Sequence, residues 1–382
     1  MPRTEPRPMS RGQVIADTAP IASLDGIRAL AVLLVVFAHS GLERIVPGGL
    51  GVTVFFVLSG FLITTLMQRE YAARGALQLG AFYLRRLLRL MPPLLVVVAL
   101  AAMLSSLTWI DGRFSTQGLL SLLFYLGNYQ VIFADFGGMP AGIGVVWSLA
   151  VEEHFYLLYP PLAVVLLGTQ QRRTVVLVLL SLCLLVLGWR CVLYALGASQ
   201  AYLSMATDTR ADAILVGCLM AFWSNPATTA PPPRNDRRDR AMAFACVSLL
   251  LLTLMVRNDA FRQTLRYSLQ SLAIAPLIHL AVARATQAPY RMLSARPLVY
   301  LGGVSYTIYL SHQMILDGLH AQWPTLAWAP RLGLGLILTL ALAELMRRAV
   351  EAPCAELRRQ LHRRAVLPTA AAADAGEAAS TR

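Results

Sequence analysis

The chain has 382 residues, of which 57% are hydrophobic and only 14% are charged, and its mean hydropathy is +0.59. Soluble domains carry about 25% charged residues, so this composition excludes a water-soluble fold. Apolar runs of about 20 residues recur along the chain, each long enough to cross a hydrocarbon core of about 30 Å. The sequence therefore predicts an all-α, polytopic integral membrane protein with about ten transmembrane helices.

The formal charge of +13 comes from arginines that lie mostly between the apolar runs. This spacing argues against a nucleic-acid partner and makes the lipid bilayer the expected partner. The cysteines stand singly, without the CxxC spacing of metal or haem sites. We therefore expect neither a metal site nor a disulfide framework from Cys183, Cys191, Cys218, Cys246 and Cys354.

An eleventh apolar stretch, 117–133, decides the topology. If it does not cross, every arginine-rich connection lies on one side and obeys the positive-inside rule. We therefore expect it to be re-entrant or laid against the bundle, with Asn128 and Gln130 buried in protein. The ten candidate spans are 27–43, 50–67, 90–109, 145–168, 174–197, 211–224, 241–257, 265–284, 298–317 and 330–348.

This topology gives a multi-pass plasma (inner) membrane protein with both termini in the cytoplasm. No cleavable signal peptide is expected, because a polar segment of 24 residues precedes the first apolar run. Any chemistry must be done by the membrane bundle, because no connecting loop is long enough to fold independently. The expected parts are a cytoplasmic polar segment 1–24, a helical bundle 25–350, a disordered cytoplasmic linker 225–240 within it, and a basic, disordered cytoplasmic tail 351–382.

Ionisable residues inside membrane spans are costly and are therefore functional candidates. In the first span, Arg28 and His39 are eleven residues apart, which is three helical turns plus about 20°. Both side chains thus share one face, about 16 Å apart along the axis. A histidine can take a proton from a hydroxyl near neutral pH. The alternative is that Arg28 only reaches the interface and His39 only hydrogen-bonds a neighbouring helix.

A second polar group opens the span at 145–168. Ser148, Glu152 and Tyr156 are spaced i, i+4 and i+8 and therefore stack on one helix face. A carboxylate there suits orienting a histidine or binding a sugar hydroxyl. Glu153 points about 100° away, and it and His154 also fit a solvated cap at the membrane boundary.

Three arginines, Arg85, Arg86 and Arg89, share one helical turn at the cytoplasmic start of the third span. Such a cluster suits phosphate binding by charge-assisted contacts, although positive-inside sorting requires arginines there as well. The segments 208–212 and 302–313 add charged, aromatic and histidine side chains to later spans. Together they indicate an unusually polar interior, built either for chemistry or for contacts between helices.

These residues, taken in order over about 21–354, resemble the membrane acyltransferase-3 family. The resemblance implies an enzyme that transfers an acyl group, commonly acetyl from acetyl-CoA, to a hydroxyl of a glycan or other acceptor, often at the outer face. The matching residues are Arg28 with His39, the stretch 51–63, Arg85 and Arg86 with Arg89, Trp147 and Ser148 with Glu152 and Glu153, Ser305 and Tyr306 with Tyr309 and His312, and Glu351 with Pro353.

The resemblance also implies roles for these residues. Arg28 and His39 are the expected essential pair, with His39 either activating the acceptor hydroxyl or briefly carrying the acyl group. We add Glu152 as a group that orients the base or binds the acceptor. Acyl-CoA is a donor substrate, and no tightly bound cofactor is expected. The CoA phosphates are assigned to Arg85, Arg86 and Arg89, and the acceptor to Trp147, Ser148, Glu153, Tyr306 and His312.

Two departures from the family pattern are visible. Thr53 stands where many relatives have aspartate, which puts in doubt a carboxylate role in the second span. The hydrolase-like extracytoplasmic domain fused to some relatives is not expected here. Such a chain would either complete the transfer alone or pass the acyl group to a separate extracytoplasmic partner.

Other readings of the same pattern remain open. A polar interior with paired charges also describes a transporter of a polar or acylated small molecule, although no internal repeat is evident. A structural or sensory membrane protein would use the same residues only to hold helices together. If the chain is an acyltransferase, lipopolysaccharide, an exopolysaccharide, peptidoglycan, a nodulation-type oligosaccharide and an antibiotic or other secondary metabolite all fit as acceptor.

Overall fold

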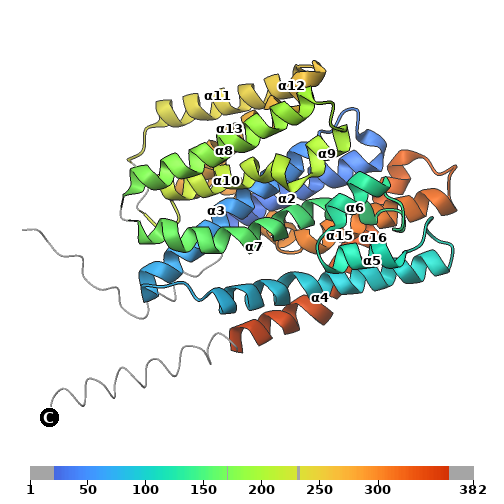
Figure 1. The fold of residues 1–382 in the computed structure, drawn as a ribbon. Helices are drawn as coiled ribbons and strands as arrows, with labels where there is room; N and C mark the ends of the chain where they lie inside the picture. The colour runs from blue at the N-terminus through green and yellow to red at the C-terminus, as the bar shows by residue number, and fades with distance from the viewer. Residues whose placement is uncertain (1–20, 170, 230–232, 361–382) are drawn as a thin grey trace, which may run out of the picture.

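The structure is a computed structural model, and it describes residues 21–169, 171–229 and 233–360. These residues form a bundle of helices without a β-strand in the described ranges, which confirms the all-α prediction (Figure 1). The elements are α2 (Ala22–Phe37), η1 (Ala38–Leu42), α3 (Gly48–Arg74), α4 (Leu79–Ser106), α5 (Thr116–Leu123), α6 (Gly127–Ala134), η2 (Ile143–Val146), α7 (Trp147–Gly168), α8 (Arg172–Ala195), α9 (Gln200–Met205), α10 (Thr207–Trp223), α11 (Asp236–Met255), α12 (Asp259–Gln263), α13 (Leu265–Ala283), η3 (Tyr290–Ser294), α14 (Arg296–Gly303), α15 (Ser305–Gln322), α16 (Trp328–Met346) and η4 (Arg347–Glu351).

Seven helical segments in the described ranges are long and apolar enough to cross a membrane, so the predicted count of about ten is not confirmed. The predicted spans 211–224 and 241–257 correspond to α10 and α11, which are short or charged at one end. The predicted span 298–317 is divided between α14 and the polar helix α15. The seven segments are Ala22–Leu42, Gly48–Arg74, Leu79–Ser106, Ile143–Gly168, Arg172–Ala195, Leu265–Ala283 and Trp328–Gln360.

The difficult apolar stretch 117–133 is divided between two short helices, α5 and α6, of 8 residues each. A helix of that length is about 12 Å long, far less than the hydrocarbon core. Tyr125, between them, has a φ of 57°, which breaks the helix. Asn128 and Gln130 are both buried, as expected for a segment laid against the bundle.

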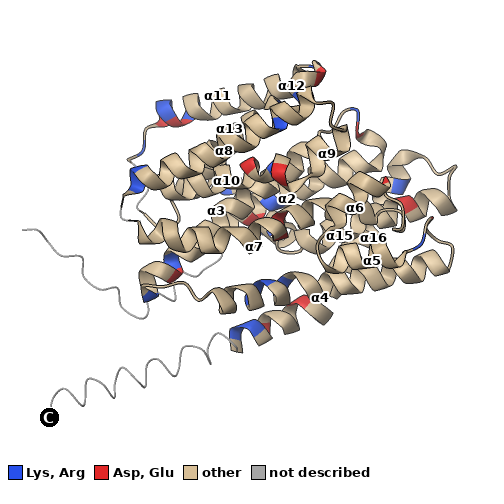
Figure 2. Cartoon of the chain, in the orientation of Figure 1, with Lys and Arg blue, Asp and Glu red and all other residues tan. Residues whose placement is uncertain are grey.

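The bundle has one strongly basic end, where α3 connects to α4 and α7 connects to α8. Arg74 lies in the last turn of α3, and α8 begins with Arg172 and Arg173. The arginines at the start of α11 lie at this same end (Figure 2). The opposite end holds η1, α5, α6, α9 and α12 (Figure 1).

Helix α3 runs through the centre of the bundle and packs closely against α10. Phe56, Val57 and Phe61 on α3 are fully buried. The two helices approach so closely at Gly60 and Gly217 that no side chain fits at either position. A Cβ atom on Gly60 would lie 1.9 Å from the carbonyl oxygen of Ile214, and one on Gly217 would lie 2.1 Å from that of Val57. Small residues at such crossings let helices pack backbone to backbone in membranes.

The predicted linker 225–240 is shorter in the structure. Asn225 is buried and donates to Thr65 Oγ1 (2.9 Å) and Gln68 Oε1 (2.7 Å), so the chain stays attached to α3 after α10 ends. Asn235 caps α11 by accepting from the backbone N–H of Arg238 (3.0 Å), and α11 therefore begins at Asp236. Residues 230–232 lie outside the described residues.

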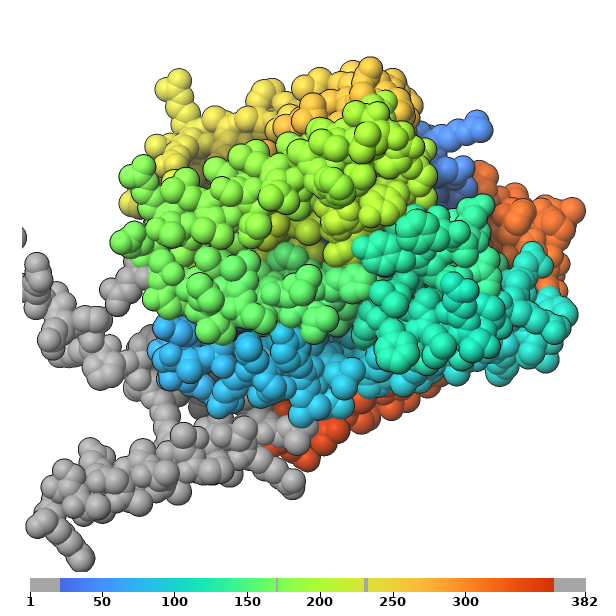
Figure 3. All heavy atoms as spheres, in the orientation of Figure 1, coloured from blue at the N-terminus to red at the C-terminus, as the bar shows by residue number. Residues whose placement is uncertain are grey.

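The two predicted polar ends are described only in part. Helix α2 begins at Ala22, and residues 1–20 of the predicted segment 1–24 lie outside the described residues. At the other end the helix that starts at Trp328 continues to Gln360, and residues 361–382 lie outside the described residues. In the space-filling view the red C-terminal segment lies beside α4, where η4 contacts that helix (Figure 3).

Candidate active site

Two histidines from distant parts of the chain meet in the bundle. His39 lies in η1, a π-helical turn that ends α2, and His312 lies in α15. The two imidazoles are joined by a 2.9 Å hydrogen bond between Nδ1 of His39 and Nε2 of His312. Their ring centroids are 5.1 Å apart. The sequence assigns His39 to the essential pair and His312 to the acceptor, and the structure brings the two into direct contact.

The π-helical turn explains how His39 is presented. Gly41, two residues later, has a φ of 96°, a conformation that favours glycine, and it ends the helix there. Single π turns within α-helices are rare and occur frequently at functional sites. His39 is exposed, whereas His312 is fully buried. The pair therefore has one imidazole that a substrate can reach and one that it cannot.

Hydroxyl groups of α15 connect this helix to the start of α7 and to α4. Tyr309 donates to the carbonyl oxygen of Val145 (3.0 Å), so it accepts from Ser148 Oγ at 2.7 Å. Tyr306 donates to the carbonyl oxygen of Leu90 in α4 (2.8 Å). These contacts hold α4, α7 and α15 together around the polar interior.

The remaining residues assigned to the acceptor lie on α7. Trp147 packs edge-on against Phe56, with ring centroids 6.2 Å apart. Glu153 is directed toward α4 instead of toward the histidines. His154, which fitted a solvated cap, shares a 2.7 Å hydrogen bond with Thr207.

Glu152 is the centre of a second polar cluster, in the interior between α3, α4 and α7. Its Oε2 accepts from Ser59 Oγ (2.7 Å) and from the hydroxyl of Tyr156 (2.9 Å), and lies 3.8 Å from Nη2 of Arg86. Nε of Arg86 lies 3.5 Å from Oε1 of Glu153, and its guanidinium stacks on the Tyr156 ring at 3.6 Å. One arginine thus faces two carboxylates. In the described part of the chain, no contact joins Glu152 to His39.

The three arginines assigned to the CoA phosphates point in different directions. Arg85 forms an ion pair with Glu70 of α3 (3.0 Å), and Arg86 is engaged by the carboxylates of α7. Arg89 is exposed and lies within electrostatic range of Arg28 and Arg358. A site for several phosphates would therefore be built from Arg89 with cations of α2 and the C-terminal helix.

Arg28, the other half of the expected essential pair, is separate from His39. It forms an ion pair of 2.6 Å with Asp25, one turn earlier on α2. Its side chain is 21% exposed, so it remains accessible from the polar interior. The described contacts thus place Arg28 beside the arginines and His39 beside His312, at two depths of the same helix.

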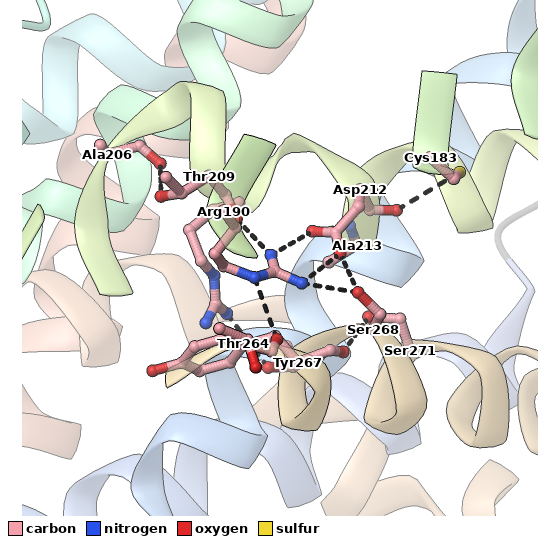
Figure 4. A network of polar contacts seen from close by, with 12 residues as sticks. Cys183, Arg190, Ala206, Thr209, Asp212, Ala213, Thr264, Tyr267, Ser268 and Ser271 are labelled. Carbon is pink, nitrogen blue, oxygen red and sulfur yellow. Dashed lines mark hydrogen bonds and ion pairs between the residues drawn. The ribbon is translucent and has the colours of Figure 1, made fainter. Parts of the chain in front are cut away.

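Sequence reasoning missed Arg190, which belongs to a buried ionic network between α8, α10 and α13 (Figure 4). Arg190 of α8 and Asp212 of α10 form an ion pair of 2.9 Å, with side-chain exposures of 0% and 1%. Ser268 of α13 donates to Asp212 at 2.5 Å, and Arg190 donates to the carbonyl oxygens of Thr264 (3.0 Å) and Thr209. An arginine inside the apolar run 174–197 was the signal that could have found it.

The neighbouring Arg210 forms no ion pair within 4 Å among the described residues, and the carboxylate in its electrostatic range is Asp212, which is already paired with Arg190. Arg210 is 2% exposed, donates to Thr53 Oγ1 at 3.2 Å, and stacks on the Tyr267 ring at 3.9 Å. Its Nε atom has no hydrogen-bond partner among the described residues. Thr53, where the resemblance implies an aspartate in many relatives, is thus the residue that faces this arginine.

The fold and these contacts define a helical membrane protein with a hydrogen-bonded histidine pair and an arginine–carboxylate cluster in its interior. The sequence matches the acyltransferase domain family, acyltransferase-3, over residues 21–348, and the chain belongs to this family. Members of that class are acyltransferases that move groups other than aminoacyl groups. No solved structure matches the chain.

Several curated proteins are similar to the chain. It is 32% identical over 348 residues to the peptidoglycan O-acetyltransferase OatA of Listeria monocytogenes, which covers 87% of the chain and 55% of that protein. It is 30% identical over 354 residues to a Bacillus subtilis protein named "Putative peptidoglycan O-acetyltransferase YrhL", covering 87% and 54%. The chain thus spans a little over half the length of these relatives.

Proposed function

We propose that this chain is a membrane O-acetyltransferase that moves an acetyl group from acetyl-CoA to a hydroxyl of a glycan. The observation that carries the proposal is the exposed imidazole of His39, which directly follows the apolar stretch 29–38 and forms a 2.9 Å hydrogen bond with His312. Peptidoglycan is the first acceptor to test, because two similar proteins are named for it.

The reaction uses His39 as a general base. Its free nitrogen takes the proton of the acceptor hydroxyl while the oxygen attacks the thioester carbonyl. The C–S bond then breaks, the acetyl group stays on the acceptor oxygen as an ester, and the leaving thiolate takes the proton back from the imidazolium. Donor and acceptor must both reach this nitrogen within about 3 Å, directly or through one water.

The donor is expected to enter from the basic end. Positive-inside sorting makes this end cytoplasmic, where acetyl-CoA is available. Arg89 is exposed there, with Arg28 and Arg358 in electrostatic range. Arginines bind phosphates by charge-assisted hydrogen bonds, so this group is the proposed contact for the CoA phosphates. The acceptor then approaches from the opposite end, where η1 carries His39.

The test compares wild type with His39→Gln, expressed at matched levels in a host that lacks its own copy. Acetyl ester is released from isolated peptidoglycan and from the other extracytoplasmic glycans and quantified by mass spectrometry. His320→Gln is the matched control, because His320 is an exposed histidine near the end of α15 whose side chain hydrogen-bonds Arg331 (2.7 Å).

We expect acetyl ester with wild type and His320→Gln, and background levels with His39→Gln. Equal acetylation by His39→Gln would show that His39 is structural. An absence of new ester on every glycan with the wild type would overturn the acetyltransferase proposal for this acceptor class. If the purified protein moved an intact acylated molecule across a membrane and released no CoA from acetyl-CoA, the transporter alternative would be favoured.

A further inference from the structure

The hydrogen bonds of His312 determine which of its nitrogens carries the proton. Its Nδ1 lies 2.7 Å from the carbonyl oxygen of Tyr309 and 3.2 Å from that of Ile308. A carbonyl oxygen only accepts hydrogen bonds, so Nδ1 must be the donor. In a neutral imidazole the other nitrogen then carries a lone pair. Nε2 of His312 is therefore an acceptor.

This acceptor in turn fixes the state of His39. Nε2 of His312 faces Nδ1 of His39 at 2.9 Å, so Nδ1 of His39 must donate. Neutral His39 then has its lone pair on Nε2, the nitrogen directed away from His312. Two backbone carbonyls thus set the proton position of His312, and Nε2 of His312, beside the Val35 carbonyl that also contacts the His39 imidazole, sets that of His39.

We propose that His312 is a positioning residue that holds His39 in the tautomer with a free Nε2 and so makes Nε2 the catalytic base. The inference rests on the proposed function for its activity readout, but the tautomer can be observed without any reaction. His312 suits this role because it is fully buried and does not itself meet the acceptor.

The surrounding contacts keep His312 in place. The preceding turn of α15 is tied down through Tyr309, which bonds to Ser148 and to the Val145 carbonyl. When His39 takes the hydroxyl proton it becomes an imidazolium, and its Nδ1–H bond to His312 becomes charge-assisted and stronger. His312 thus acts as the orienting third group of a nucleophile–base system, here a neutral imidazole instead of a carboxylate.

Two substitutions of similar size separate positioning from packing. In His312→Gln the side-chain amide reaches the place of Nε2 and can still accept from His39. In His312→Asn the amide reaches only the place of Nδ1, so His39 loses its acceptor. His320→Asn, at an exposed position on the same helix, controls for the substitution itself.

The activity test measures kcat and KM for acetyl-CoA with purified full-length protein in lipid nanodiscs and a soluble glycan acceptor. We expect His312→Asn to lower kcat about 100-fold, with KM within about twofold, because the ground-state contacts of the donor are unchanged. His312→Gln should recover most of kcat, and His320→Asn should match wild type. A loss that follows thermal stability in both His312 variants would show a merely structural role.

The second readout is the tautomer itself, by NMR of wild-type protein labelled with ¹⁵N-histidine. The chain has only six histidines, and His39→Gln identifies the His39 signals. We expect a protonated Nδ1 and an unprotonated Nε2 on His39, and a mixture of tautomers in His312→Asn. A proton on Nε2 in wild-type His39 would overturn the inference even if acetyl transfer is observed. If no variant transfers acetyl groups, the function proposal fails while the tautomer still decides the role of His312.

Discussion

The guanidinium of Arg190 and the carboxylate of Asp212 form an ion pair of 2.9 Å that is sealed from solvent and joins α8 to α10. Ser268 extends the pair to α13 through its hydroxyl, which contacts both charged groups. The network lies away from the histidine pair and is fully hydrogen-bonded around Arg190. We therefore expect it to hold three helices in register instead of taking part in acyl transfer.

Removing one member of this pair should destabilise the protein severely. Arg190→Met leaves the Asp212 carboxylate buried without a counter-ion, at a cost of about 3–5 kcal/mol. The thermal midpoint of the protein in detergent, followed by size-exclusion chromatography, measures the effect. The double variant Arg190→Met with Asp212→Leu should recover much of the loss, because neither member of the pair then leaves its partner's charge buried alone. A double variant as unstable as the single one would contradict this account.

Thr53→Asp should stabilise the protein. The Thr53 hydroxyl lies 3.2 Å from Nη2 of Arg210, whose buried charge shares the Asp212 carboxylate with Arg190. A carboxylate at position 53 would neutralise Arg210, for an expected gain of about 1 kcal/mol or about 2 °C in melting temperature. Thr53→Asn, which has the same shape and no charge, is the control and should give no comparable gain. Equal behaviour of the two variants would show that Arg210 needs no counter-ion.

Gly60→Ala should disrupt the packing of α3 on α10. Its new methyl group would lie 1.9 Å from the Ile214 carbonyl oxygen, so the helices must separate. Overpacking of this kind costs about 1–3 kcal/mol. Gly188→Ala is the matched control, since nothing lies within 4 Å of a Cβ at that position of α8. Melting curves of the two variants in the same detergent test this, and similar midpoints would contradict the predicted close approach.

Among the arginines of α4, Arg89 should matter most for the donor. It is exposed and makes no hydrogen bond to a described residue, whereas Arg85 is already paired with Glu70. Loss of a charge-assisted contact to phosphate costs about 1.5–3 kcal/mol. Arg89→Gln is therefore expected to raise KM for acetyl-CoA about 10–100-fold with little change in kcat, and Arg85→Gln much less. Steady-state kinetics in nanodiscs decide this, and a larger effect at Arg85 would relocate the phosphate contact.

Much of the site could be predicted from the sequence because polar groups inside apolar runs are conspicuous. His39, Glu152 and His312 were all found in this way. Their partners were not, because contact between residues 273 positions apart depends on how the helices pack. Glu152 was expected to act near the base, yet it faces Ser59, Tyr156 and Arg86. Arg190 was overlooked because the run around it was interpreted only as a span.

The sequence by itself determined that the chain is a helical membrane protein of the acyltransferase family, since hydropathy, helix periodicity and motif order are local properties. Only the tertiary structure decided that His39 contacts His312, that Arg86 faces the carboxylates of α7, and that Arg190 is paired with Asp212. The physical reason is that a hydrogen bond or ion pair depends on distances of about 3 Å. Such distances between helices are set by packing, including the close approach at Gly60, and no single segment contains them.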